Sequence, residues 1–244
     1  MKTQQSDNTR PAASAQPAGP DSAPSRQPAL VRILPFAAYM AFIAIADLLD
    51  RFGMAAAELR WLYAVKIGVV LALLFAFRRH YRELAWQPLG ARGWLAAVAT
   101  GLLVLLLWVN LDAAWMQIGS AAGFDPRGAG GGIDWPLALV RIAGAALVVP
   151  LMEELFWRSF LLRWLERADF LKVNPAHVKF KAFIVTVILF GLEHHLWFAG
   201  MVAGAAYGLL YMRSQNLWSP ILAHAVTNGG LGIWVLMTGN WSFW

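Results

Sequence analysis

Long apolar blocks constrain this chain more than any other feature of its sequence. Seven of them follow a polar start, near residues 33–49, 61–77, 94–111, 135–162, 180–193, 198–212 and 217–237. Because about 17–25 apolar residues span a bilayer as a helix, the blocks predict an all-α, polytopic membrane helix bundle of about seven transmembrane helices. The fourth block is long enough to hold an eighth, interfacial helix after a break. Only 14% of the residues are charged, against about 25% in a soluble domain.

The first 28 residues are polar and rich in Pro, Ser, Ala and Gln. Such a composition cannot bury enough apolar surface to offset the entropy of ordering, so residues 1–28 are expected to form a disordered N-terminal tail. The tail lacks the apolar h-region of a signal peptide, so no cleavage is expected. Residues 29–244 are then expected to form the membrane domain.

The chain contains no cysteine. This excludes disulfides, cysteine-ligated zinc, iron–sulfur clusters and a cysteine nucleophile. The net charge is +6, which can indicate nucleic-acid binding, but basic residues in a membrane protein more often mark cytoplasmic loops. We therefore expect the lipid bilayer as a partner and no nucleic acid.

Basic residues are unevenly distributed among the loops between the blocks. Loops rich in them alternate with loops poor in them, which predicts a cytoplasmic N-terminus and an odd number of spans. The rich loops contain Arg78, Arg79, Arg82, Arg92, Arg163, Arg167, Lys172, Lys179 and Lys181.

Charges inside an apolar block are costly and indicate function by default. The fourth block contains Glu153 and Glu154, followed four residues after Glu154 by Arg158. On a helix Glu154 and Arg158 share a face and can pair, whereas Glu153 points about 100° away. One carboxylate is then neutralised while the other faces a cavity, as a general base would. The alternative is a structural ion pair at a helix end.

A second polar group ends the fifth block. Phe190 and His194 are four residues apart and lie on one helical face, and His194 suits a base, a hydrogen-bond donor or a metal ligand. Its neighbour Glu193 either orients the site or caps a short loop. For His195 we favour an interfacial position at the end of the helix, with no role in chemistry.

A third polar group lies inside the seventh block. His224 and Asn228 are four residues apart and point the same way. Two uncharged donors on one face can stabilise an oxyanion. The alternative is an interhelical hydrogen-bonded pair, which is common in membrane bundles.

Together the three groups resemble one family. Glu-Glu-x-x-x-Arg, then Phe-x-x-x-His, then His-x-x-x-Asn, in this order on separate apolar segments, are similar to the signatures of the CAAX protease and bacteriocin-processing (CPBP, or Abi) family. Its eukaryotic members are the type II CAAX prenyl endopeptidases. The likeness covers about residues 135–237, the expected catalytic core, while the first three blocks carry no such signature.

A narrower resemblance covers Phe190 to Asn228. This stretch is similar to the CAAX prenyl protease-related subgroup of bacterial exosortase clusters, which serve exopolysaccharide systems and the sorting of PEP-CTERM proteins. The likeness implies a multi-pass protein of the bacterial inner membrane, a membrane-bound protein or peptide as substrate, and partners from an exosortase system.

The family resemblance implies glutamate-dependent peptide hydrolysis in a membrane cavity. Glu153 and His194 would activate a water molecule, His224 and Asn228 would hold the oxyanion, and Arg158 would pair with Glu154. These six residues are expected to carry the chemistry, and Phe190, Glu193 and His195 to support it. Glu153, His194, His224 and Asn228 should converge on one cavity, which requires tilted helices or a break near Pro150.

Three alternatives remain open at this point. Glu and His side chains could bind a catalytic zinc, but His-Glu-x-x-His is absent and we expect no cofactor. The scaffold could be catalytically silent, as in an immunity protein. A transporter is the third alternative, although its polar residues would spread over several helices, whereas here they cluster on three.

Overall fold

The computed structural model describes residues 27–119, 121, 123–128 and 130–244. Within these residues it contains seven long helices and no strand, only an isolated bridge between Arg127 and Ile133. The helices are α1 (Gln27–Arg51), α3 (Leu62–Phe77), α4 (Gly90–Trp108), a central helix made of the consecutive segments α5 to α7 (Trp135–Trp164), α8 (Phe180–Leu192), α9 (Trp197–Ser214) and α10 (Trp218–Thr238). Short turns connect them: α2 (Ala56–Leu59), η1 (Arg78–His80), η2 (Arg82–Leu84), η3 (Ala114–Met116), η6 (Phe170–Lys172), η7 (Pro175–His177) and η8 (Trp241–Phe243).

The prediction of a helical membrane bundle is confirmed, with one long helix for each apolar block. Four helices of the described chain are long and apolar enough to cross a membrane, namely α1, α4, the central helix and α10. Of the expected disordered tail, residues 1–26 lie outside the described residues. Helix α1 begins at Gln27, two residues before the expected start of the membrane domain.

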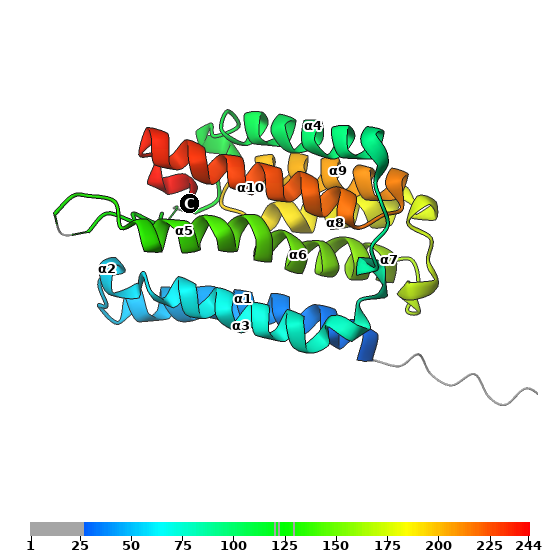
Figure 1. Ribbon diagram of the computed structural model, residues 1–244, viewed down its shortest axis with the longest axis horizontal. Helices are drawn as coiled ribbons and strands as arrows, with labels where there is room; N and C mark the ends of the chain where they lie inside the picture. Colours follow the sequence, from blue (N-terminus) through cyan, green and yellow to red (C-terminus); the bar gives the residue numbers. More distant parts are fainter. Residues whose placement is uncertain (1–26, 120, 122, 129) are drawn as a thin grey trace, which may run out of the picture.

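The central helix lies between two groups of helices (Figure 1). On one side α1 packs against α3, and both contact the central helix. On the other side α4 packs against α10 and α8 against α9, and α10 runs along the central helix. The motif residues of the fourth block therefore face both halves of the bundle.

Of the two conditions given for convergence, tilted helices or a break near Pro150, the break is not present. The helix continues from Trp135 to Trp164 and absorbs the proline by a change in hydrogen bonding. Gly144–Val148 (η4) is π-helical, and the Val149 N–H donates to the Gly144 carbonyl, five residues earlier. A proline ring clashes with the carbonyl four residues before it, and a wider π turn relieves this crowding without ending the helix.

Small residues bring α8 and α9 into close contact. A Cβ atom on Gly191 would lie 2.7 Å from the Trp197 carbonyl oxygen, and one on Gly200 would lie 3.0 Å from the Gly191 Cα. Neither position has room for a side chain. The close approach holds the turn between the two helices, which carries His194, against the bundle.

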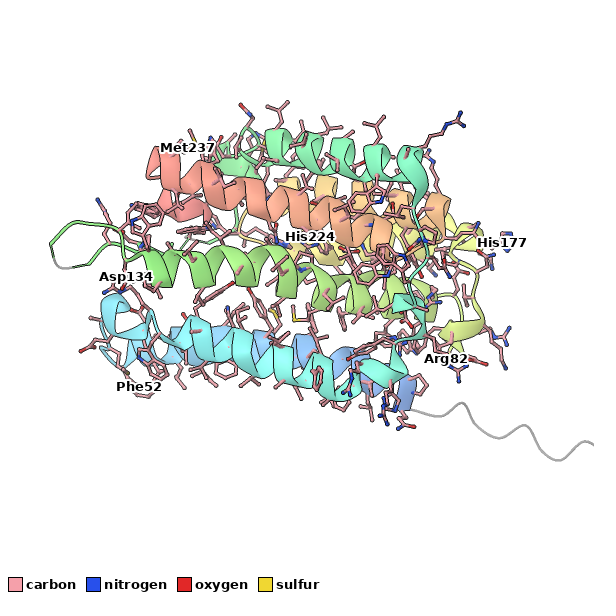
Figure 2. All side chains as sticks on the ribbon, viewed as in Figure 1. Phe52, Arg82, Asp134, His177, His224 and Met237 are labelled. Carbon is pink, nitrogen blue, oxygen red and sulfur yellow. The ribbon has the colours of Figure 1, made fainter. Side chains whose placement is uncertain are left out.

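The two ends of the bundle differ in their residues. In Figure 2, Arg82 and His177 lie at the end where α1 begins, whereas Phe52, Asp134 and Met237 lie at the opposite end. We call these the basic end and the far end. The loops rich in arginine and lysine, after α3 and after the central helix, both lie at the basic end.

A buried ionic cluster joins α1 to the central helix near the basic end. Arg32, which is 1% exposed, donates from Nε and Nη2 to the two carboxylate oxygens of Glu83, both at 2.7 Å. Ser159 donates to the same carboxylate and accepts from Arg32 and Arg163 at 3.1 and 2.8 Å. We call these four residues the Arg32–Glu83 cluster, and it fixes the register between α1, the η2 turn and the central helix.

Candidate active site

Residues of all three motifs line one cavity of about 180 Å³ inside the bundle. The motif residues in its lining are Glu153, Phe190, His194, His224 and Asn228. Its other walls include Tyr39, Tyr63, Trp108, Arg141, Tyr207 and Thr227. Figure 2 labels His224 in the middle of the bundle, where α10 passes the central helix. Motif residues separated by up to 75 positions in the sequence, from Glu153 to Asn228, thus line one cavity.

Glu154 is the structural member of the glutamate pair. It is fully buried, and its Oε1 accepts from Arg158 Nη1 at 3.1 Å and from His224 Nδ1 at 3.0 Å. Arg158 is 1% exposed, lies over the Phe190 ring at 4.4 Å and also donates to the Gly204 carbonyl. The carboxylate therefore connects the central helix to α10, and its arginine connects that helix to α8 and α9.

Glu153 has a different environment from Glu154. The residue is 4% exposed and lines the cavity, which Glu154 does not. Oε2 is buried without a hydrogen-bond partner in both glutamates, but only Glu154 has an Oε1 bound to Arg158 and His224. Buried polar atoms in proteins are nearly always paired, so an unpaired one calls for an explanation such as a catalytic role. The divergence of the two carboxylates agrees with the helical offset read from the sequence.

The turn after α8 presents the ring of His194 to the cavity. Its Nδ1 lies 2.7 Å from the Phe190 carbonyl oxygen, which can only accept, so Nδ1 carries the proton of this bond. In the neutral ring the other nitrogen, Nε2, is then an acceptor. The ring lies edge-on to Trp108 at 5.3 Å, which restricts its rotation. His194 can thus accept a hydrogen bond from a water molecule in the cavity.

His224 is held more tightly than the sequence suggested. Its ring stacks on Tyr207 at 4.9 Å, and its Nδ1 donates to the Glu154 carboxylate. Because Nδ1 already carries a proton, Nε2 becomes a donor only when the ring is doubly protonated. The interpretation of His224 as an uncharged donor therefore has to be corrected: a donating His224 is an imidazolium beside Glu154.

Asn228 donates a hydrogen bond to the central helix just before Pro150. Its Nδ2 donates to the Ala145 carbonyl at 2.9 Å. The Val149 N–H, the ordinary α-helical donor to Ala145, is directed to Gly144, and Pro150 has no N–H. Asn228 thus supplies a donor that the helix lacks, and the second N–H of its amide is left for another acceptor.

The comparison with known families agrees with this arrangement. The sequence model of the family described as "Type II CAAX prenyl endopeptidase Rce1-like" matches residues 135–230. The match begins with the central helix and ends within α10, so it contains all three motifs. Over these residues the chain is similar to the CAAX protease family. No curated protein and no solved structure matched the chain.

Two predicted supporting residues lie beside the CAAX protease motifs and not in the cavity lining. Glu193 accepts a hydrogen bond from Trp157 Nε1 at 3.0 Å, so it anchors the turn after α8 to the central helix. His195 points to the loop before the central helix, with Nδ1 2.7 Å from the Ile118 carbonyl oxygen and Nε2 3.1 Å from Gln117 Oε1. It thus ties the turn that carries His194 to this loop, near the far end.

Sequence reasoning missed several residues of the cavity. Tyr39 and Tyr63 come from helices outside the family match, and Trp108 ends a third one. The statement that polar residues cluster on three helices was therefore too narrow. Arg141 had a detectable signal, a charge within the fourth apolar block, whereas nothing in the pattern marked the tyrosines.

The side chains that could bind a metal ion can be compared with what a metal site needs. Among the residues described, no three His, Asp or Glu side chains form a group suited to a metal ion. The Nδ1 atoms of His194 and His224 both have partners, so only their Nε2 atoms remain for other ligands. The absence of a cofactor stays a prediction.

Proposed function

We propose that the chain is a glutamate-dependent endopeptidase that hydrolyses a peptide bond of a membrane-associated protein or peptide. The observation that supports this most is that Glu153, whose Oε2 has no hydrogen-bond partner, and His194, whose Nε2 is available as an acceptor, line the same cavity. Similarity to a protease family supports the same class of reaction.

In the proposed reaction a water molecule lies between Glu153 and His194. Glu153 takes one of its protons while the oxygen attacks the carbonyl carbon of the substrate, and a tetrahedral intermediate forms. The C–N bond then breaks, and the proton held by Glu153 passes to the leaving amine. A positioned general base of this kind contributes about 10²–10⁴ in rate.

The developing oxyanion needs donors on the other side of the cavity. The free N–H of the Asn228 amide is one, and the Nε2–H of a protonated His224 is the other. Donors held in place before the reaction stabilise such a charge without having to reorient. Glu154 and Arg158 act as positioning residues, because Glu154 Oε1 binds Arg158 and His224 and the arginine also binds the Gly204 carbonyl.

The finer features of the function are also proposals. The reaction as written needs no metal, so activity should persist in excess chelator, and recovery only on addition of zinc would contradict this. The resemblance over Phe190–Asn228 supports a role in an exosortase system. The basic end supports an N-terminus on the cytoplasmic side of a bacterial inner membrane.

The test is a Glu153→Gln substitution in the native host, followed by proteomics of membrane fractions. We expect an uncut precursor to accumulate that is processed in the wild type. A matched control is Glu166→Gln, because Glu166 pairs with Lys179 at the basic end and lies outside the cavity. An unchanged peptide profile with an intact phenotype would favour a silent scaffold over an enzyme.

A further inference from the structure

Arg141 on the cavity wall and Lys66 behind two tyrosines of that wall lie close to one ring without an acidic partner. Arg141 lines the cavity, and its guanidinium carbon lies 4.3 Å from the centre of the Tyr63 ring. Lys66, which is 8% exposed, lies 5.0 Å from the same ring and 4.0 Å from that of Tyr39. Within the described part of the chain, no carboxylate forms an ion pair with either of them.

This arrangement is unfavourable unless an anion completes it. An arginine cannot lose its proton in a protein, and a buried charge is costly unless it is paired. The aromatic rings compensate the two positive charges in part, but the buried Nε of Arg141 has no hydrogen-bond partner. The buried arginines Arg32 and Arg158 contrast with the half-buried Arg141, since each of them binds a glutamate.

We propose that Arg141, assisted by Lys66, forms a binding subsite for a carboxylate group of the substrate. A guanidinium presents parallel N–H groups that match the two oxygens of a carboxylate. The proposal deepens the proposed function and rests on it only in taking the ligand to be a peptide. It assigns a role to two charges that the three motifs do not include.

The position of the subsite sets the direction of the substrate. Arg141 precedes Glu153 by twelve residues on the same helix, which is about 18 Å along its axis. An extended peptide covers about 3.3 Å per residue, so the bound carboxylate lies at most about five residues from the bond cleaved at Glu153. That carboxylate is either the terminal group of a peptide or an acidic side chain near the cleaved bond.

The test measures binding and does not depend on hydrolysis. The full chain, purified in a non-ionic detergent, is titrated calorimetrically with N-acetylleucine, with N-acetylleucinamide and with the α-amide of N-acetylglutamate. We expect at least one of the two acids to bind about tenfold more tightly than the neutral amide. Arg141→Gln should abolish this preference and leave the binding of the amide unchanged, and Lys66→Gln should weaken it.

Two further variants make the outcome specific. Arg51→Gln is the matched control, because Arg51 is an exposed arginine whose ion pair lies outside the cavity. It should keep the preference, and so should Glu153→Gln, even if that variant no longer hydrolyses peptides. Preference for N-acetylleucine indicates a terminal carboxylate, and preference for the glutamate derivative indicates a side chain.

Several results would overturn the proposal. Equal binding of acids and amide by the wild type would do so, as would an acid preference that survives Arg141→Gln. Displacement of the bound acid by short-chain phosphatidylglycerol, dependent on Arg141, would assign the subsite to a lipid phosphate instead. Loss of hydrolysis in Glu153→Gln without loss of the preference separates this proposal from the proposed function.

Discussion

Two buried ionic clusters lie along the same central helix, and they use their polar atoms differently. In the Arg32–Glu83 cluster, both oxygens of Glu83 accept hydrogen bonds. The second cluster, at the cavity, consists of Glu153, Glu154, Arg158 and His224. In it, one oxygen of Glu153 and one of Glu154 are buried without partners. Ser159 of the first cluster and Glu154 of the second are only five residues apart, so the difference is not one of depth in the bundle.

The comparison separates residues that hold the fold from residues that are available for chemistry. A fully paired cluster has no capacity left to bind a substrate, but it is costly to disrupt. A cluster with unpaired oxygens makes the folded protein less stable, but these oxygens remain available to bind a ligand. Four substitutions test this distinction through the free energy of unfolding, measured by SDS titration of the purified protein.

The largest effect is expected for Glu83→Gln. This change leaves Arg32 and Arg163 without their shared counter-ion near the basic end, and breaking a buried pair costs about 3–5 kcal/mol. The variant should unfold at much lower SDS concentration than the wild type. A loss of stability no larger than that of a surface ion-pair variant would show that the cluster is not structural.

Asn228→Ala should have the next largest effect. It removes the donor to the Ala145 carbonyl, and an unsatisfied group of this kind costs about 1–2 kcal/mol in a membrane bundle. In a Pro150→Ala background the helix regains an N–H, so the same change should cost less. Identical costs in the two backgrounds would refute the link between the proline and the asparagine.

Trp157→Phe should cost about 1 kcal/mol. The change keeps most of the buried ring and removes one hydrogen bond, from the indole N–H to Glu193. Combining it with Glu193→Ala should add little beyond the effect of Glu193→Ala alone, because both changes remove the same hydrogen bond. Full additivity in the double mutant would show that the contact does not contribute to stability.

Asp47→Asn should have the smallest effect. Its ion pair with Arg51 lies on the surface, with the two side chains 60% and 73% exposed, and such pairs are worth at most about 1 kcal/mol. The expected unfolding curve therefore nearly overlays that of the wild type. A shift as large as that of Glu83→Gln would remove the contrast between surface and buried pairs.

The helices themselves could be read from the sequence with good accuracy. Each apolar block corresponds to a helix, because a stretch in lipid must satisfy its own backbone hydrogen bonds. The π turns of the central helix were not predictable in the same way. For the turn at Gly144–Val148 the cause is local, at Pro150, but the hydrogen bond that accompanies it comes from Asn228, on another helix.

The candidate site was predictable where its residues share one helix. Spacing alone separated Glu153 from Glu154, since four-residue periodicity selects the partner of Arg158. Contacts between helices were not predictable, because periodicity does not say which faces meet. The bond from His224 to Glu154 and the positions of Tyr39 and Lys66 depend on such contacts, so a single sequence could not reveal them.

The central claim is that Glu153 carries the chemistry and does not stabilise the fold. Its most direct test measures Glu153→Gln twice, by SDS unfolding and by the ratio of uncut to processed substrate in host membranes. We expect unchanged or slightly raised stability, with processing reduced at least about 100-fold, the low end for a general base. Processing at the wild-type level in a stably folded variant would contradict the account.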